Sequence, residues 1–383
     1  MTSPELPAVP RYDGAHLRHV LPSCAAVLGV PGYENTLGLP AARRVCVVMV
    51  DGLGLSLLKA RGGHAPFLRG ALDSNRTLDV SFPTTTAASL ASFATGATPA
   101  EHGIVGYDVV DPGTRSVVNQ LGNWPGWLDP VEWQPQQTVL ERAAEVVGVT
   151  TVSLPEFASS QLTRAALRGG DFVGARSVQA RVRAASEALA KHERSLVYLY
   201  FNELDKTGHR HGSGSLKWGE QLEELDFALR TLTKRLPAST LVLLTADHGM
   251  VDVPVKQRID YSLHADLVAG VELTAGEPRA VQLHVTDPAR VDRVVDAWRS
   301  HFGAKVWVLT REDAVAGGYF GSGLRDGVAA RIGDVLVLAR EHELALYDGR
   351  RVAPHAFDMV GQHGSLTRAE REVPLLTLAK PKD

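Results

Sequence analysis

The chain has 383 residues, of which 44% are hydrophobic and 22% are charged, so it can bury the core of two domains or of one large domain with an insertion. Its 40 basic and 43 acidic residues are well mixed, and no run of Lys and Arg marks a nucleic-acid or membrane surface. These properties disfavour a nucleic-acid duplex or a membrane as a partner. Two cysteines are too few for a disulfide framework.

The N-terminal sequence predicts no export signal. It lacks a basic start that leads into an apolar segment, and no stretch of about 18 apolar residues occurs in the chain. We therefore expect a cytoplasmic protein. Residues 1–40 carry six prolines and a short helical pattern near 21–28, which is typical of a lead-in segment that packs on the main body.

From residue 45 onward, strand-like apolar runs alternate with helical patterns. The predicted strands are 45–50, 76–82, 149–153, 196–201 and 240–245, and the predicted helices are 54–61, 85–95, 138–147, 177–191 and 216–235. This alternation indicates an α/β fold with a doubly wound, mostly parallel sheet.

The regularity changes in the last third of the chain. The patterns there predict a strand at 276–285, a helix at 288–302, a strand at 304–310 and a hairpin at 334–347. We interpret residues 269–351 as a small inserted α+β cap, and residues 41–268 with 352–383 as the main domain. The irregular segment 112–136 carries four prolines and three tryptophans, and long loops of this kind often build substrate pockets.

Acidic residues and histidines stand where the predicted strands end. Asp51 directly follows the apolar run 45–50, and Asp247 and His248 follow the run 240–245 within three residues. In an open parallel sheet, ligands bind outside the carboxyl ends of the strands, so side chains at several strand ends can converge. These three residues are therefore candidate metal ligands.

Two further segments supply ligands of the same types. Asp205 and His209 follow the run 196–201 and lie four positions apart, although spacing alone leaves His211 as a rival for His209. His363 lies in a G-Q-H-G segment whose glycines let the backbone approach a ligand closely. Carboxylate and imidazole ligands suit zinc well, and manganese or iron less decisively.

A hydroxyl nucleophile is suggested by three consecutive threonines. Thr84, Thr85 and Thr86 follow Pro83 and precede a predicted helix that ends at Gly96. Thr84 or Thr85 could simply cap this helix. A hydroxyl in the first helical turn is also well placed beside a bound phosphate. Threonine needs activation to act as a nucleophile, and no histidine lies nearby in sequence, which favours activation by a metal.

Two spaced motifs resemble a known family. The F-P-T-T-T segment at 82–86 is followed by T-G, by a proline and by H-G-I-V up to residue 105. This series, together with the N-E-L-D-K-T-G-H block at 202–209, resembles the type I phosphodiesterases and nucleotide pyrophosphatases of the alkaline phosphatase superfamily. The resemblance covers about residues 45–374 and implies an alkaline phosphatase-like fold.

The resemblance also implies site residues and a reaction. It implies a two-metal phosphoesterase that forms a covalent phosphothreonine intermediate on Thr86, with Zn²⁺ as the metal most typical of it and Mn²⁺ as the alternative. One ion is then held by Asp205, His209 and His363, and the other by Asp51, Asp247 and His248 with Thr86 beside them. The motif spacing thereby favours His209 over His211.

One position departs from the family pattern. An asparagine usually follows H-G-I-V and helps to hold a phosphate oxygen, whereas this chain has Tyr107 there, with Asn119 and Asn123 as substitutes of unknown position. We expect a small phosphate ester or a dinucleotide-type substrate. A phosphomonoesterase or phosphonate hydrolase of the same superfamily is the first alternative, and a catalytically silent, metal-stabilised binding protein is the second. The sequence predicts no oligomeric state.

Overall fold

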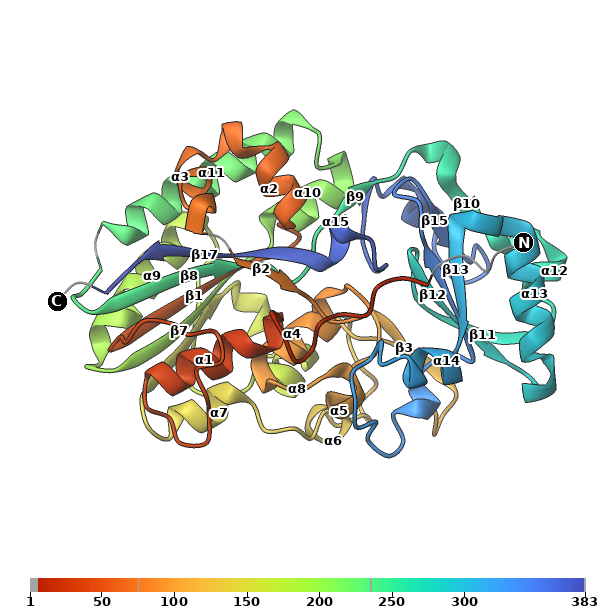
Figure 1. The fold of residues 1–383 in the computed structure, drawn as a ribbon, viewed down its shortest axis with the longest axis horizontal. Coiled ribbons are helices and arrows are strands. Elements are labelled where there is room, and N and C mark those ends of the chain that lie inside the picture. The colour runs from red at the N-terminus through yellow and green to blue at the C-terminus, as the bar shows by residue number, and fades with distance from the viewer. Residues whose placement is uncertain (1–5, 75, 235, 382–383) are drawn as a thin grey trace.

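The computed structural model describes residues 6–74, 76–234 and 236–381, and its centre is a seven-stranded sheet (Figure 1). The strand order is β2-β17-β8-β1-β7-β5-β6. The strands are β1 Arg44–Val50, β2 Arg76–Asp79, β5 Gly148–Ser153, β6 Asp171–Gly174, β7 Ser195–Phe201, β8 Thr240–Thr245 and β17 Glu372–Ala379. The pairs from β8 to β6 are parallel, and β17 is antiparallel to both β8 and β2. The predicted doubly wound, mostly parallel α/β sheet is confirmed.

Helices cover both faces of this sheet (Figure 1). The helices on one face are α2 Leu55–Ala60, α3 Pro66–Gly70, α9 Val178–Lys191, α10 Glu203–His211 and α11 Leu216–Thr233. Those on the other face are α1 Val20–Val27, α4 Thr86–Thr95, α7 Val139–Ala144 and α8 Gln161–Ala166. Since both faces are covered, the central strands must be apolar throughout, and β1 is buried at every position from Val45 to its end.

Helix α4 lies deep in the molecule. Its residues from Thr86 to Ala94 are all buried, and most of them are alanine, serine or threonine. Small side chains allow close packing around the whole circumference of a helix. Helix α1, which lies within the predicted lead-in segment, packs its residues Val20, Leu21 and Cys24 into the same core.

A second sheet lies beside the first (Figure 1). Its strand order is β11-β12-β14-β13, and all three pairings are antiparallel. The strands are β11 Val271–Glu277, β12 Ala280–Val285, β13 Val306–Thr310 and β14 Val335–Ala339. Helix α13, Val291–Phe302, packs on this sheet and contributes Trp298 to a separate hydrophobic cluster.

Two predictions for this region were wrong. The single strand expected at 276–285 is two strands, because the chain turns at Pro278 and Arg279 between β11 and β12. The hairpin expected at 334–347 does not form. Strand β14 pairs with β12 and β13, whereas β15, Ala345–Tyr347, pairs in parallel with β10, Arg258–Asp260.

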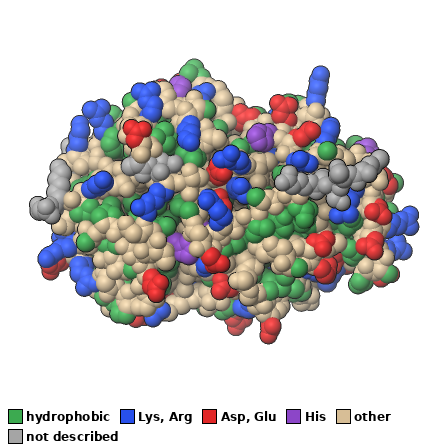
Figure 2. Space-filling model, in the orientation of Figure 1, with side chains coloured by type: hydrophobic (Ala, Val, Ile, Leu, Met, Phe, Trp, Pro, Cys, Tyr) green, Lys and Arg blue, Asp and Glu red, His purple; other side chains and the backbone are tan. Residues whose placement is uncertain are grey.

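In the main sheet, β2 ends at Asp79, three residues before the end of the predicted strand 76–82. The remaining short elements are α5 Pro99–His102, β3 Asp108–Asp111, β4 Ser116–Asn119, α6 Pro130–Trp133, β9 Val251–Asp252, α12 Ala265–Val268, α14 Arg311–Ala316, β16 Gly361–Gln362 and α15 Arg368–Arg371. In the described ranges, no helix is both long and apolar enough to cross a membrane. Both signs of charge are mixed over the face shown in Figure 2, as the sequence indicated.

Candidate metal centre

The central parallel strands β1, β7 and β8 end side by side, and the segments that follow them carry acidic residues and histidines. Asp51 follows β1 directly, and its Oδ2 accepts a hydrogen bond from the Tyr200 hydroxyl on β7. After β8, Asp247 Oδ1 accepts from the backbone N–H groups of Gly52 at 3.1 Å and of His248 at 3.0 Å. The Nε2 atom of His248 lies 3.3 Å from Asp51 Oδ1 and 3.6 Å from Asp247 Oδ2.

Helix α10 begins immediately after β7, and it was not predicted from the sequence. Because residues four apart share one helical face, Asp205 and His209 point the same way, with Asp205 Oδ1 3.3 Å from His209 Nε2. His211 lies elsewhere, with its ring 3.5 Å from the Lys217 ammonium. The structure therefore brings His209, and not His211, to the cluster.

His363 reaches the cluster from a loop near the end of the chain. Its Nε2 lies 4.0 Å from Asp205 Oδ1, and its ring stacks on that of His248 at 3.7 Å between centroids. The following residue, Gly364, has a φ of +128°, and a Cβ there would come within 2.5 Å of the Glu277 side chain. Only glycine fits this position without strain.

The three imidazoles share one hydrogen-bonding pattern. The Nδ1 atoms of His209, His248 and His363 lie 2.7, 3.0 and 2.8 Å from the carbonyl oxygens of Gly361, Gly249 and Thr84. A carbonyl can only accept, so each Nδ1 carries a proton, and it is each Nε2 that faces the cluster. This arrangement is typical of histidines that bind a metal.

The carboxylates of the cluster lack hydrogen-bond donors for some of their oxygens. Asp51 Oδ1, Asp205 Oδ1 and Asp247 Oδ2 are buried, and among the described residues none has a hydrogen-bond partner. Buried oxygens of this kind are costly unless a donor or a cation satisfies them. Ligand atoms of Asp51, Asp247 and His248 lie within 4.8 Å of one another, and so do those of Asp205, His248 and His363. The donor set fits divalent cations.

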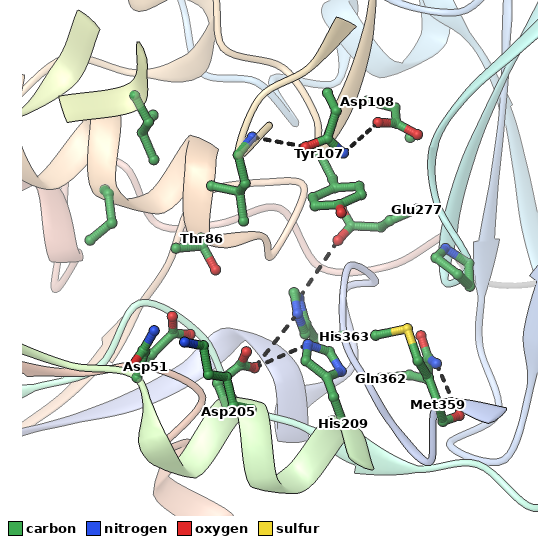
Figure 3. A pocket seen from close by; sticks show the side chains of 18 of the residues that line it. Asp51, Thr86, Tyr107, Asp108, Asp205, His209, Glu277, Met359, Gln362 and His363 are labelled. Carbon is green, nitrogen blue, oxygen red and sulfur yellow. Dashed lines mark hydrogen bonds and ion pairs between the residues drawn. The ribbon is translucent and has the colours of Figure 1, made fainter. Parts of the chain in front are cut away.

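The three threonines have three different environments. Thr86 is the first residue of α4, and its Oγ1 lies 3.1 Å from His248 Nε2. Thr85 occupies the N-cap position, but its side chain makes no capping hydrogen bond. Thr84 Oγ1 donates to the carbonyl of Ser365 at 2.9 Å and accepts from the N–H of Gly364 at 3.0 Å. Thr84 thus holds the loop of His363, and Thr86 is the threonine that faces the cluster (Figure 3).

Residues 45–366 match the sequence profile of a family described as type I phosphodiesterase / nucleotide pyrophosphatase. The chain belongs to this family. It is therefore a hydrolase of phosphate esters, from a metal-dependent family whose ligand types the cluster supplies.

Solved structures agree with the fold. The murine ectonucleotide pyrophosphatase / phosphodiesterase 5, inactive through a threonine-to-alanine substitution and in complex with AMP, is 18% identical with a TM-score of 0.68, over 87% of each chain. The human protein of the same name has a TM-score of 0.67 at 18% identity over the same shares. Phosphonoacetate hydrolase from Sinorhizobium meliloti 1021, in complex with phosphonoacetate, is 19% identical with a TM-score of 0.66, over 89% of this chain and 91% of the other.

Negative charge in this cluster shifts the pKa values of its own members. Burial and the nearby Asp51 carboxylate raise the pKa of Asp247 well above its ordinary value. Burial alone would lower the pKa of His248, but the carboxylates of Asp247 and Asp51 raise it to about 10. Both shifts have one cause, which is negative charge concentrated in a place that water does not reach.

A cavity of about 660 Å³ opens from Thr86 and the cluster toward the second sheet (Figure 3). Tyr107 lines this cavity, and burial raises the pKa of its hydroxyl. Asn119, at the end of β4, lines it too, and its amide donates to the Asp108 carboxylate at 2.8 Å. Asn123 is not among the lining residues. Of the two asparagines considered from the sequence, Asn119 is the one near the site.

Several cavity residues were not found from the sequence. Tyr200 lies in an uninterrupted apolar strand, where nothing distinguishes its hydroxyl as a partner of Asp51. Glu277 lies at the end of β11, and burial raises the pKa of its carboxyl group to about 8. A charged residue between glycine and proline was the one signal that could have drawn attention to Glu277.

Proposed function

We propose that the chain is a two-metal phosphodiesterase or nucleotide pyrophosphatase that acts through a covalent phosphothreonine on Thr86. The observation that carries this proposal is the convergence of imidazole Nε2 atoms and unpartnered carboxylate oxygens around the Thr86 hydroxyl. Two divalent cations, most suitably Zn²⁺ and alternatively Mn²⁺, complete the site. Zinc accepts this mixture of nitrogen and oxygen ligands.

The ligands divide into two groups in this proposal. Asp205, His209 and His363 hold one ion, and Asp51, Asp247 and His248 hold the other beside Thr86. The contact of His248 with Thr86, at 3.1 Å, supports the second group. The stacked rings of His248 and His363 leave the two groups adjacent, as a shared substrate phosphate requires. When bound, such ions lower the pKa of a nearby hydroxyl or water and stabilise charge on phosphoryl oxygens.

The chain's own residues then carry the reaction. Thr86 Oγ1 attacks phosphorus, the Oγ1–P bond forms, and the bond from phosphorus to the leaving oxygen breaks. The proton of the Thr86 hydroxyl leaves with the departing alcohol. Water next attacks the phosphothreonine, its oxygen bonds to phosphorus, the Oγ1–P bond breaks, and one proton of the water passes to Thr86 Oγ1. Tyr107 and Asn119, which line the cavity beside Thr86, orient the phosphoryl group with their hydroxyl and amide.

Two of the similar structures support this reading. The murine phosphodiesterase 5 holds AMP in a form described as inactive after a threonine-to-alanine substitution, which is what a threonine nucleophile predicts. The bacterial hydrolase holds phosphonoacetate, so a phosphonate hydrolase is the second candidate function. The substrate is accordingly a small phosphate diester, a dinucleotide-type compound or a phosphonate.

We propose in addition that residues 269–351 act as the cap that closes over the substrate, with 1–40 as the lead-in and 41–268 with 352–383 as the catalytic domain. Strand β11 supports this role, because its residues 275–277 line the cavity. We also propose a cytoplasmic location, which fractionation of cells that express the tagged chain tests.

Replacement of Thr86 tests the proposal. Thr86→Ala should retain both metals and lose almost all kcat, whereas Thr86→Ser should keep measurable turnover because a primary hydroxyl takes the same place. Thr95→Ala, at the far end of α4, is the matched control and should keep the normal rate. The nucleophile assignment is wrong if Thr86→Ala stays near the normal rate, or if acid quench with a radiolabelled diester traps phosphate on another residue.

A further inference from the structure

One buried carboxyl group in the cavity, that of Glu277, has no role in the reaction described above. Glu277 ends β11, and only 6% of the residue is exposed. Its carboxylate points into the cavity toward His363 and lies beside Tyr107 (Figure 3). Its Oε1 has no hydrogen-bond partner among the described residues. The hydroxyl of Thr85 lies close enough to influence the carboxyl group, but not in hydrogen-bonding geometry.

His363 does not satisfy this carboxylate. Its Nδ1 lies 3.6 Å from Glu277 Oε2, beyond hydrogen-bonding distance, and it already donates to the Thr84 carbonyl at 2.8 Å. Through its Nε2, the same ring is committed to the metal centre. Glu277 therefore keeps a free acceptor atom although it lies next to a histidine.

None of the other charged neighbours pairs with the carboxyl group of Glu277. Asp108 and Glu370 repel it, and the arginines nearest to those two groups are engaged by them: Arg351 pairs with Asp108, and Arg279 pairs with Glu370. His248 attracts it, but His248 is neutral once it holds the proposed metal. The carboxyl group of Glu277 therefore has no positively charged partner among these neighbours.

The position of Thr86 indicates on which side of the phosphorus Glu277 lies. In an in-line displacement, the attacking and leaving oxygens lie on opposite sides of phosphorus. Thr86 Oγ1 lies at the group that contains His248, so the leaving oxygen faces the group of Asp205, His209 and His363. Glu277 contacts His363 on the edge of the ring opposite Nε2. It thus lies in the cavity next to the group that faces the leaving oxygen.

We propose that Glu277 recognises a primary ammonium group on the leaving alcohol of the substrate. This inference rests on the proposed function and specifies its substrate class. An ammonium group donates hydrogen bonds to Oε1 and supplies the missing positive charge, and the Tyr107 ring beside Glu277 offers it an aromatic face. Since the imidazole of His363 separates Glu277 from the centre, several bonds separate the nitrogen from the phosphorus.

A matched pair of substrates tests this assignment. Methyl para-(aminomethyl)phenyl phosphate and methyl para-tolyl phosphate have the same phosphoryl group, and their leaving phenols differ in the ammonium group. The kcat/KM ratio of the first to the second should fall about tenfold or more in Glu277→Gln, because the amide of glutamine carries no negative charge to pair with the ammonium group and its Oε1 is a weaker acceptor. The two diesters differ in intrinsic reactivity, but this difference is the same in every protein. It therefore cancels when the kcat/KM ratio of one variant is compared with that of another. Glu272→Gln, on the same strand but exposed and paired with Arg115, is the control and should keep the normal ratio.

Other outcomes separate the two proposals. Equal ratios in Glu277→Gln and the normal protein, with normal turnover of the tolyl diester, overturn the ammonium site and leave the phosphodiesterase intact. Equal losses on both substrates, with loss of metal, also overturn it and make Glu277 a positioning residue for His363. If neither diester is cleaved, the proposed function fails. Calorimetric binding of para-(aminomethyl)phenol then decides the site alone: tighter binding to the normal protein than to Glu277→Gln supports it, and equal binding overturns it.

Discussion

The ion pair between Arg279 and Glu370 should be one of the most sensitive points of the structure. Both side chains are fully buried, and the guanidinium donates to the two carboxylate oxygens at 2.7 and 2.9 Å. Its remaining nitrogen donates to the carbonyls of Glu341, His342 and Leu344. Arg279→Met removes all of these donors and keeps most of the volume. Removing one partner of a buried ion pair costs about 3–5 kcal/mol, and the three carbonyls favour the upper end of this range.

Equilibrium urea unfolding with saturating zinc, followed by circular dichroism, measures this loss. Glu370 also accepts from the backbone N–H of Ser365 at 3.0 Å, two residues after His363, so Arg279→Met should weaken zinc binding as well. The double variant Arg279→Met with Glu370→Leu should recover part of the stability, because no unpaired charge remains. A loss below about 1 kcal/mol in Arg279→Met, or a double variant less stable than the single one, would refute the reasoning.

Three further predictions follow from the site and the core. Asp247→Ala and His363→Ala should each lower zinc content and kcat, because each would remove one of about three protein ligands from a proposed metal site. Elemental analysis and a diester assay measure this, and full metal with a full rate in either variant contradicts its role. Burial lowers the pKa of both His16 and His102 to about 3, so the folded state does not take up a proton near pH 5 whereas the unfolded state does. The free energy of unfolding should therefore fall by roughly 2 kcal/mol for each of the two histidines from pH 7 to pH 5. In urea titrations, His102→Gln should lose the part of this pH dependence that His102 contributes. An unchanged pH dependence argues against a neutral, buried His102. Tyr107→Asn should raise the ratio of diester to monoester kcat/KM, and an unchanged ratio would show that Tyr107 is not at the phosphate.

The regular strands and helices could be predicted from the sequence because each depends on the pattern of apolar residues within its own segment. The apolar run that ends at Val50 can only be a strand covered on both faces, and the carboxylate after it must lie at the sheet edge. The positions of Asp51, Asp247 and His248 followed from this argument. The residue spacing alone left His211 open, and the family resemblance chose His209; helix α10 supplies the physical reason, because it turns a four-residue spacing into one shared face.

Strand partners and cavity walls could not be read in the same way. Strand β15 pairs with β10, which lies more than 80 residues earlier, and residue propensities carry no information about that choice. Glu277 and His363 meet only because the second sheet packs beside the first. The alternation of buried and exposed positions reports how deep a residue lies, but not which distant residue faces it.

The position of β17 has a consequence for how the protein folds during its synthesis. This strand, the last of the described strands, lies between β2 and β8 in the finished sheet. As the chain leaves the ribosome, β8 has an open edge until residues 372–379 arrive, and unpaired edges promote aggregation. Asp51, Asp247 and His248 precede this step, whereas His363 arrives just before β17. We expect one metal group to be assembled early and the other only when the newly synthesised chain closes its own sheet.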